Sequence, residues 1–484
     1  MSGEAQVVGS GPNGLVAALL LQRSGLQVTV HERAAQAGGG LRTEPLSRPG
    51  HRRDTCAAVL PLAAASPFFR TLDLGVTWLH PPAALAHPLD DGTAIMLWRD
   101  LRDTARQLGP EDSAAYERLL RPLAGAWDAL IAEVLAPPHW PRSAALYARF
   151  ARSAARSAAG LAASHFTAAR ARALFAGLAA HGTLPLDRPR SAAFGLVLAL
   201  AAHTTGWPLV QGGAGALAAG LIAQLERAGG KLRLRSEPAS LSDLHGAEAI
   251  VLDVAPRDFL RLAGARLPRR AAERLRRFPY GCGVHKVEWS LSQPVPWRAA
   301  ECAAAGTVHL GGTLAEIAAS VRAASSDRGA TAPFVLFGQP TRFDVTRAPP
   351  GEHNAWAYCA VPLGSTGDYT AAIEAQVERF APGFREIVLS RDVRTAALLE
   401  QHNPNLVGGS LAGAVHSVPR FFFGPFVSTS PYRTPLPRVY LCSAATPPGP
   451  GVHGMCGYHA ARRVLRDLGR GDVGLYLSGL PSIL

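Results

Sequence analysis

The chain has 484 residues, of which 48% are apolar and 18% are charged. This balance supports a large buried core and excludes a disordered chain. At about 100–200 residues per domain, the length predicts two or three domains. The formal net charge of +13 is nearly all arginine, since only Lys231 and Lys286 are lysines. We interpret it as compositional bias and expect no nucleic-acid partner, because no nucleic-acid-binding motif accompanies it.

Residues 5–32 have the pattern of a β-strand, an α-helix and a second strand. VVGSGPNG places Gly9, Gly11 and Gly14 in the GxGxxG spacing at the start of the helix. These glycines allow a tight turn, the approach of a pyrophosphate and close packing of helix on strand, and the helix N-terminus attracts phosphate. Glu32 ends the second strand, where a carboxylate accepts hydrogen bonds from ribose. The pattern predicts a dinucleotide site that includes Ser10, Pro12, Asn13 and Arg33.

A second glycine turn, AGGGLRTE at 37–44, follows the ribose acid. It places Gly39, Gly40 and Leu41 directly before Arg42. A second turn with an arginine suits a longer cofactor whose pyrophosphate takes another cationic partner. This segment therefore favours FAD over NAD.

Residues 100–205 are rich in alanine and leucine and are expected to be helical. The longest apolar run, near Ala192–Ala202, is shorter than the ~20 residues of a membrane span. Arginines recur among alanines and aromatic residues from Arg142 to Arg190. They fit either a solvated helix face or an amphipathic helix on anionic lipid, so peripheral membrane contact stays open. No secretory signal precedes the first strand, and we expect a cytoplasmic protein.

A third glycine-rich stretch, QGGAGALAAGL at 211–221, also precedes a helix. Its GGxG spacing and the following strand, KLRLR, differ from a nucleotide fingerprint. We expect this helix to pack on the sheet and regard a second nucleotide site as the alternative. Buried strands are then expected at 249–254, 283–291 and 438–444, with a helix near 370–380.

The segment YLCSAATPPGPGVHGMCGYHAARRVL at 440–465 places Gly449, Gly451 and Gly454 before a C-terminal helix. Its N–H groups and positive dipole end suit developing negative charge. No CxxC pair and no His/Cys cluster with metal spacing accompany the six cysteines, so we expect neither a disulfide centre nor a metal. Covalent cofactor attachment through Cys442 or Cys456 is an alternative.

These motifs resemble the phytoene desaturase-like branch of the flavin amine oxidase superfamily. The matching stretches include VVGSGPNGL, AGGGLRTEPLSRPGHRRDTCAAVLPLAAASPFF, VQGGAGALAAGL, RAPPGEHNAWAYCAVP and VYLCSAATPPGPGVHGMCGYHAAR. The resemblance implies FAD, with the C-terminal helix aimed at the flavin pyrimidine and the backbone near Pro238 against the adenine. Ser443 stands where many relatives carry an acid, and Pro450 replaces a common glycine. Beyond the residues named above, the cofactor site implied by the resemblance contains Val59, Pro238, Ser443, Gly451, Val452, His453, Gly454 and Met455.

The expected fold is α/β, with a Rossmann-like FAD-binding domain of the glutathione reductase type 2-like class. That domain is predicted to be discontinuous, from residues 1–95, 206–285 and 432–484. Residues 96–205 would form a helical insertion or cap, and residues 286–431 an α+β substrate domain.

Two ionisable residues are candidates for catalysis, Lys286 and His453. Lys286 lies on an apolar strand, and the chain keeps lysine there although it uses arginine almost everywhere; a compact, deprotonatable amine differs from a guanidinium. The resemblance places a lysine on a similar strand, holding water at flavin N5. The alternatives are a lysine on a solvated strand face and a histidine that only caps the helix.

The expected function is FAD-dependent removal of hydride from a hydrophobic small molecule to flavin N5. Such chemistry requires a dry pocket that aligns a C–H bond with the flavin. The alternatives are a flavin-dependent isomerase without net redox, a flavin amine oxidase and a non-catalytic binding protein on the same fold. The sequence leaves the oligomeric state open. About a third of the following aromatic residues are expected to line the pocket: Phe68, Phe69, Phe194, Trp207, Trp289, Trp297, Trp356 and Phe421–Phe423.

Overall fold

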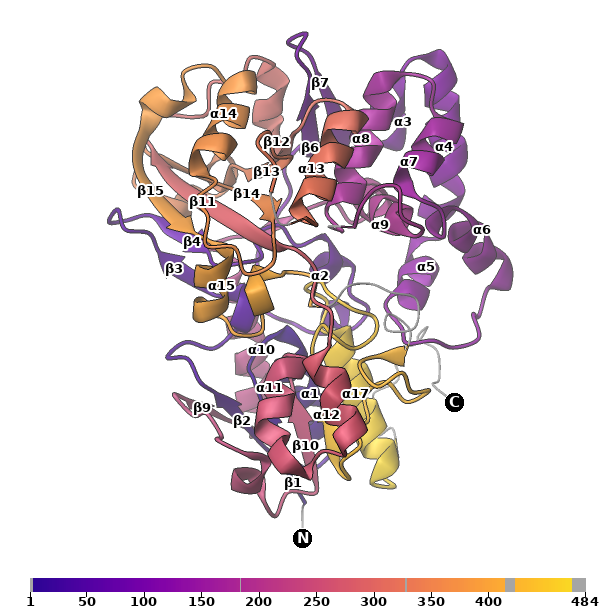
Figure 1. The fold of residues 1–484 in the computed structure, drawn as a ribbon, viewed down its shortest axis with the longest axis vertical. Helices are drawn as coiled ribbons and strands as arrows, with labels where there is room; N and C mark the ends of the chain where they lie inside the picture. Colours follow the sequence, from indigo (N-terminus) through magenta and orange to yellow (C-terminus); the bar gives the residue numbers. More distant parts are fainter. Residues whose placement is uncertain (1–2, 183, 327–328, 414–422, 472–484) are drawn as a thin grey trace.

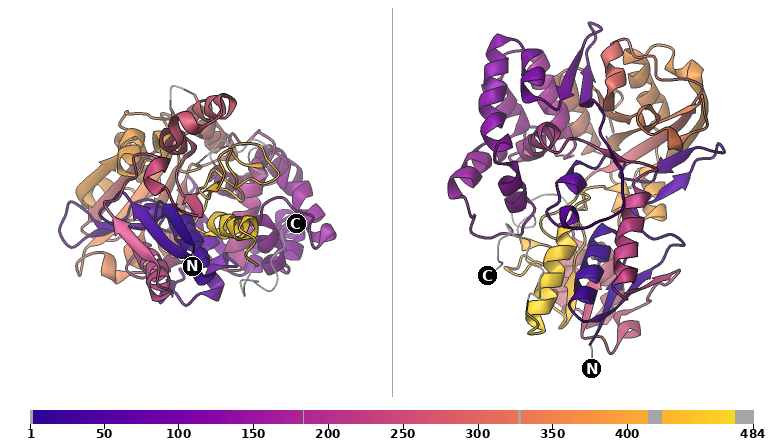
Figure 2. Two further views of the ribbon diagram at one scale, coloured as in Figure 1. Left: turned by 90° about the horizontal axis from the view of Figure 1, so that it is seen from below. Right: turned by 180° about the vertical axis from the view of Figure 1, so that it is seen from behind.

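The computed structural model describes residues 3–182, 184–326, 329–413 and 423–471. Two large β-sheets, two small two-stranded sheets and a group of helices make up the described part of the molecule (Figure 1). The first sheet lies in the lower body with both ends of the described chain. The second sheet lies above it on one side, and the helices of the predicted insertion lie above it on the other side. The view from behind shows the same arrangement (Figure 2).

The lower sheet is five-stranded and wholly parallel, in the order β16-β10-β1-β2-β9. Alternate residues of its strands pack on opposite faces: Val7 and Val251 face the core of α1, α10 and α17, and Ile250 and Leu252 face α11 and α12. Burial on both faces is the reason that the strand β10, AIVL, is apolar throughout, whereas the edge strand β9, KLRL, is mostly exposed. The elements are β1 (Glu4–Val8), β2 (Gln27–Glu32), β9 (Lys231–Leu234), β10 (Ala249–Leu252), β16 (Val439–Leu441), α1 (Pro12–Arg23), α10 (Gly215–Arg227), α11 (Pro256–Ala263), α12 (Arg269–Arg276) and α17 (Met455–Asp467).

The upper sheet is seven-stranded and mixed, in the order β15-β11-β14-β13-β12-β6-β7. One face packs on α14 (Thr370–Phe380) through a core that contains Trp289, Phe337 and Phe384. The strand β6 lies within the predicted FAD segment 1–95, and β7 crosses its end into the predicted insertion 96–205, but both pair in this upper sheet, β6 running parallel to β12. The strands are β6 (Ala83–Pro88), β7 (Ala94–Trp98), β11 (Gly283–Leu291), β12 (Ala305–Leu310), β13 (Val335–Gly338), β14 (His353–Val361) and β15 (Val388–Arg394).

The helices of the predicted insertion stand beside the upper sheet (Figure 1). The arginine-rich stretch is divided among α6 to α9 and is not one amphipathic helix. Within it, Arg149 and Arg152 of α6 are exposed, whereas α8 and α9 are largely buried. Among the described residues, none of the helices is both long and apolar enough to cross a bilayer. The helices are α3 (Leu101–Arg106), α4 (Pro110–Ala124), α5 (Trp127–Val134), α6 (Ala144–Ala154), α7 (Ala158–His165), α8 (Ala169–Ala180) and α9 (Ser191–His203).

Short elements join the lower body, which contains the five-stranded sheet, to the upper body, which contains the seven-stranded sheet. The hairpin of β3 (Thr43–Pro45) and β4 (Arg52–Asp54) runs from the lower body to the upper sheet, where Arg53 pairs with Glu288 at 3.2 Å.

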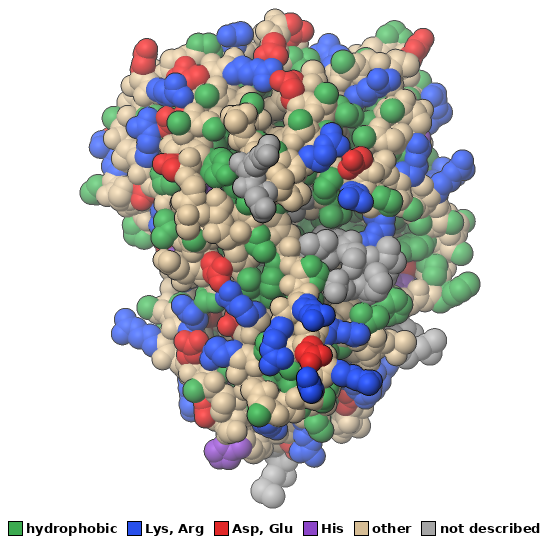
Figure 3. All heavy atoms as spheres, in the orientation of Figure 1, with side chains coloured by type: hydrophobic (Ala, Val, Ile, Leu, Met, Phe, Trp, Pro, Cys, Tyr) green, Lys and Arg blue, Asp and Glu red, His purple; other side chains and the backbone are tan. Residues whose placement is uncertain are grey.

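Lys and Arg side chains gather over α11 and α12 on the face shown in Figure 3. The remaining elements are α2 (Pro61–Ala65), β5 (Trp78–Leu79), β8 (Leu209–Val210), α13 (Leu314–Ala324) and α15 (Ala396–His402).

Candidate cofactor and substrate site

A cavity of about 790 Å³ lies between the lower body, the upper sheet and the helical insertion. Its wall begins at the carboxyl ends of β1, β2 and β10, the edge where open parallel sheets bind ligands. From there the wall continues to the upper sheet and to α5, α6 and α9. The cavity therefore joins a nucleotide-type site to a second, mainly apolar arm.

The first wall of the cavity is the turn between β1 and α1. Gly9 has φ +96°, and a Cβ there would come within 2.7 Å of the carbonyl oxygen of Asp253. A Cβ on Gly11 would come within 2.5 Å of the Asp253 carboxylate. Pro12 is the first residue of α1, where its missing N–H costs nothing. The motif thus forms a close-packed turn at the start of α1, and its role as a phosphate site stays a prediction.

Glu32 stands at the end of β2 and lines the cavity. Its carboxylate accepts hydrogen bonds from the Ser10 N–H at 3.1 Å, the Ser10 hydroxyl at 2.5 Å and the Ala34 N–H at 2.8 Å. These contacts fix the carboxylate at the mouth of the turn. It is placed where an adenosine ribose would contact it.

Asp253 is a site residue that the sequence analysis missed. It follows β10, and its Oδ2 accepts a hydrogen bond from the Gly14 N–H at 2.9 Å. Burial raises the pKa of this carboxyl to about 7; the nearby Glu32 carboxylate also raises it, and the Gly14 hydrogen bond opposes both. The available signal was an acid directly after an apolar strand, AIVLDV, at the ligand-binding edge of the sheet.

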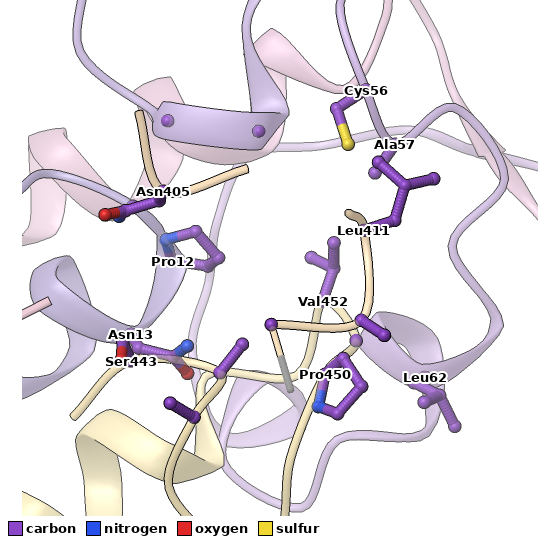
Figure 4. Close-up of a pocket in the computed structure, with 18 of the residues that line it drawn as sticks. Pro12, Asn13, Cys56, Ala57, Leu62, Asn405, Leu411, Ser443, Pro450 and Val452 are labelled. Atoms are coloured by element: carbon purple, nitrogen blue, oxygen red, sulfur yellow. The ribbon is translucent and has the colours of Figure 1, made fainter. Parts of the chain in front are cut away.

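The C-terminal helix meets α1 at the same place. A Cβ on Gly457 of α17 would lie 1.9 Å from the carbonyl oxygen of Asn13 in α1, so only glycine allows the observed packing. The loop before α17 adds Pro450, Gly451 and Val452 to the cavity wall (Figure 4). The start of α1 and the loop before α17, which are far apart in the sequence, therefore line one cavity.

His453 is fully buried and does not line the cavity. Its Nδ1 accepts the Met455 N–H at 3.0 Å, its Nε2 lies 3.2 Å from the Gly449 oxygen, and burial lowers its pKa to about 4. These contacts are those of a neutral histidine that caps α17. Cys442 and Cys456 are buried as well and are not among the residues that line the cavity.

Most of the expected cofactor residues line this cavity. Gly14, His453, Gly454 and Met455 do not, because they lie behind the turns that they shape. Arg42 lines it and donates to the carbonyl oxygens of Gly39 and His402, each at 3.1 Å. The expected residues in the wall are Gly9, Ser10, Gly11, Pro12, Asn13, Glu32, Arg33, Gly39, Gly40, Leu41, Arg42, Val59, Pro238, Ser443, Gly451 and Val452.

Among the buried polar atoms of the wall that have no hydrogen-bond partner in the described chain are Asn13 Oδ1 and Ser443 Oγ. The two side chains lie close together between the two helix ends (Figure 4). Buried polar groups are normally paired, so an unpaired set in a cavity indicates a polar ligand. Together with the glycine turns, Glu32 and Arg42, these atoms fit an extended dinucleotide.

Lys286 is buried and lies outside the cavity wall. Its Nζ donates to the carbonyl oxygen of Asp54 at 2.6 Å and pairs with Glu288 at 3.0 Å. The lysine thus holds the backbone just before Cys56, which does line the cavity. Its role in catalysis stays a prediction; its contacts are those of a positioning residue.

The third glycine stretch directs its N–H groups at protein acceptors. Gly212 N–H donates to Asp344 at 2.8 Å, Ala214 N–H to Asp54 at 2.8 Å, and Gly215 N–H to the Thr43 hydroxyl at 2.8 Å. A second nucleotide would have to displace these bonds. The geometry agrees with packing of α10 on the sheet.

The second arm of the cavity is apolar. Tyr147 and Phe150 of α6, Phe194 and Val197 of α9 and the loop after α5 line it. Of the aromatic residues expected in a pocket, Phe194, Trp207 and Trp356 line the cavity. Phe68, Phe69, Trp289 and Trp297 belong to hydrophobic cores, Phe423 is not among the lining residues, and Phe421 and Phe422 lie outside the described residues.

Comparison with solved structures identifies the architecture. Cyclohexylamine oxidase from Brevibacterium oxydans IH-35A superposes with a TM-score of 0.58 at 15% identity, covering 97% of this chain and 100% of that chain. This is the Rossmann-like FAD-binding oxidoreductase fold of the amine oxidase type. The expected fold class is therefore confirmed.

Sequence comparison agrees. The family model "NAD(P)-binding Rossmann-like domain" matches residues 7–87. The chain is 26% identical over 547 residues to "Pyridine nucleotide-disulfide oxidoreductase domain-containing protein 2" of Rattus norvegicus, covering 96% of this chain and 94% of that protein. A shorter match of 119 residues, 32% identical, covers 23% of this chain and 21% of a limonene dehydrogenase subunit of Castellaniella defragrans. The chain is thus homologous to this rat protein, and its fold is that of flavin-type oxidoreductases.

Proposed function

We propose that this protein is an FAD-dependent oxidoreductase that removes hydride from a C–H bond of a hydrophobic substrate. The observation that carries the proposal is that the start of α1 and the loop before α17 line one cavity, whose second arm is mainly apolar. FAD bound along the first arm would supply the hydride acceptor at N5. Glu32 would hold the ribose, and Arg42, Asn13 and Ser443 would face the rest of the cofactor.

The protein's own contribution is to bind the cofactor and the substrate, to align them and to keep water away from the reacting atoms. Apolar side chains of α6 and α9 exclude water from the second arm, and Asn13, Ser443 and the glycine turns orient the cofactor beside it. Hydride removal needs alignment more than proton transfer. The near absence of charged groups at the upper-sheet end of the described cavity wall fits this need.

A donor of the CH–CH type, as in phytoene desaturase-like enzymes, is the preferred substrate class. The apolar arm supports it, and one matched relative is named as part of a limonene dehydrogenase. A CH–NH donor is the second candidate, supported by the superposition on cyclohexylamine oxidase. An isomerase without net redox would use the same cavity. The close-packed phosphate turn argues against a non-catalytic protein that lacks FAD.

The test is to purify the protein with FAD and to record the flavin spectrum during anaerobic titration with polyenes, terpenes and amines. Bleaching by a polyene or terpene supports the proposal, and bleaching by amines alone replaces it with an amine oxidase. Gly11→Val is expected to abolish FAD binding, because its side chain would enter the turn. Gly471→Ala is the matched control, since a Cβ there meets nothing within 4 Å. Protein that refuses FAD would overturn the proposal.

A further inference from the structure

The inner end of the cavity is a face of the upper sheet. Strand register places Thr307 opposite Gly338 and Gly338 opposite Trp356, so these three residues form one row across β12, β13 and β14. The neighbouring row on the same face is His309, Leu336 and Tyr358. Thr307, Leu336, Trp356 and Tyr358 all line the cavity. We call these two rows the cavity floor.

Gly338 allows the Trp356 indole to lie across the floor. A Cβ at Gly338 would come within 2.3 Å of the indole ring and 2.6 Å of its Nε1. Neighbouring strands are about 4.8 Å apart, so Thr307 on β12 is the next side chain beyond Gly338 in this row. Because Gly338 has no side chain, the Trp356 indole occupies the space above it. The indole N–H therefore lies toward the side of the floor that carries the Thr307 hydroxyl.

Both of these polar groups lack a partner. Trp356 Nε1 and Thr307 Oγ1 are buried and make no hydrogen bond within the described chain. An N–H or O–H left unpaired in a dry interior costs about 1–3 kcal/mol. Their position in a cavity wall indicates that a ligand supplies the missing acceptor.

His181 adds a third donor. Its Nε2 lies 2.8 Å from Nε2 of His309, and burial lowers the pKa of His181 to about 4 and that of His309 well below its usual value, so both rings are neutral. One of the two Nε2 atoms must therefore carry the proton. A proton on His309 Nδ1 would be buried without an acceptor in the described residues, which is costly. His309 consequently donates through Nε2, and His181 carries its own proton on Nδ1.

The floor thus presents donors and no charge. His181 lines the cavity, and its Nδ1 is the ring nitrogen that does not face His309. The charged residues Glu133 and Arg190 line the cavity at the helical side, and Glu133 pairs there with His139 at 3.1 Å. No carboxylate of the described wall belongs to the floor.

We propose that Thr307, Trp356 and His181 form a subsite that donates hydrogen bonds to an oxygen atom of an otherwise apolar substrate, namely a carbonyl or hydroxyl group. This rests on the proposed function, since it defines the substrate class of the same cavity. Donors without a facing carboxylate favour a neutral acceptor and disfavour an ammonium group. The substrate is then an oxygenated hydrophobic molecule, anchored at the floor by its oxygen.

Four probes that share one carbon skeleton test the subsite: benzylacetone, the corresponding alcohol, the corresponding amine, and butylbenzene. Their dissociation constants are measured by calorimetry on FAD-loaded protein and on protein without FAD. We expect the ketone and the alcohol to bind about tenfold more tightly than the hydrocarbon and the amine. In Thr307→Val with Trp356→Phe, the four constants should agree within about threefold. Phe194→Leu is the control, which should weaken all four probes alike.

Stability provides an independent readout. Thr307→Val alone removes an unpartnered polar atom and keeps the side-chain shape, so its melting temperature should stay equal or rise. Equal binding of all four probes by the wild type, undiminished preference in the double variant, or failure of every probe to bind would each overturn the subsite. Loss of FAD binding alone would contradict the proposed function and leave the measurement on FAD-free protein to decide the subsite.

Discussion

The Asp253 carboxylate accepts a hydrogen bond from the Gly14 N–H at 2.9 Å, at the N-terminus of α1. This is the end of the helix at which a pyrophosphate would bind. A carboxylate and a phosphate therefore share one positive helix end. Because burial raises the pKa of Asp253 to about 7, the two anions compete only when the carboxyl is ionised.

Affinity for FAD should consequently depend on pH. Asp253 is neutral below about pH 7 and ionised above it, so we expect the dissociation constant of FAD to rise about tenfold from pH 6 to pH 8. Asp253→Asn should remove this dependence. Flavin fluorescence titrations at both pH values measure it. A flat wild-type profile would contradict the competition between carboxylate and phosphate.

The same group should make the cofactor-free protein less stable at high pH. The folded state raises the pKa of Asp253 from 3.8 to about 7, so it binds the proton more tightly than the unfolded chain does. The amount that this carboxyl adds to the free energy of unfolding is fully present below about pH 4 and is lost as the pH rises to about 7. We expect urea unfolding of Asp253→Asn to show a smaller loss of stability over this range than the wild type. An identical pH slope in both proteins would refute this.

The contact between α1 and α17 should not tolerate one added methyl group at Gly457. Gly457→Ala would place Cβ 1.9 Å from the Asn13 oxygen and push α17 away from α1. We expect a loss of stability of about 2–4 kcal/mol and of most FAD binding. Gly471→Ala serves again as the control. Normal FAD content in Gly457→Ala would show that the helix ends need not touch.

Lys286 is open to a test that separates the neutralisation of Glu288 from its other roles. Lys286→Met leaves Glu288 with Arg53 as its remaining ion-pair partner, and we expect a stability loss of about 3 kcal/mol. Glu288→Gln in the same chain should restore part of it, because the buried charge is removed.

The rate of anaerobic flavin reduction then shows which of these roles matters. If Lys286 matters only because it neutralises the Glu288 carboxylate, the stabilised double variant should recover its rate together with its stability. A rate that stays low after stability is restored would assign Lys286 to the positioning of the Asp54 backbone or to the chemistry.

Peripheral membrane contact also remains a prediction, and the loop before α6 is the place to test it. Trp140 is 86% exposed, and the exposed Arg149 and Arg152 follow on α6. We expect sedimentation with vesicles that contain anionic lipid, weakened several-fold by Trp140→Ala. Neutral vesicles and high salt are the controls. Equal sedimentation of the variant would exclude this loop as the contact.

The parts of the site that short motifs encode were predictable. The turn at Gly9–Gly14 and the C-terminal helix follow from glycine spacing, and the structure brings that turn, Glu32 and the loop before α17 to one cavity. Local backbone geometry dictates these features, so local sequence reveals them.

Other features depend on partners distant in the chain. The pairing of Lys286 with the Asp54 backbone joins residues 232 positions apart, and no local pattern announces it. For the same reason the strands β6 and β7 could not be placed in the upper sheet from sequence. Apolar aromatic residues are equally ambiguous, since Trp289 in the core and Trp356 in the cavity wall both lie on alternating strands.

The chain passes repeatedly between the two large sheets, and this determines whether either body can fold as a separate fragment. In the described residues the polypeptide builds β1 and β2 below, β6 and β7 above, β9 and β10 below, β11 to β15 above, and finally β16 below. The lower sheet therefore stays incomplete until after the upper one has been synthesised, and each body is tied to the other by several covalent crossings. Expression of either body as a separate fragment should give insoluble material, and the two bodies should unfold in a single cooperative transition.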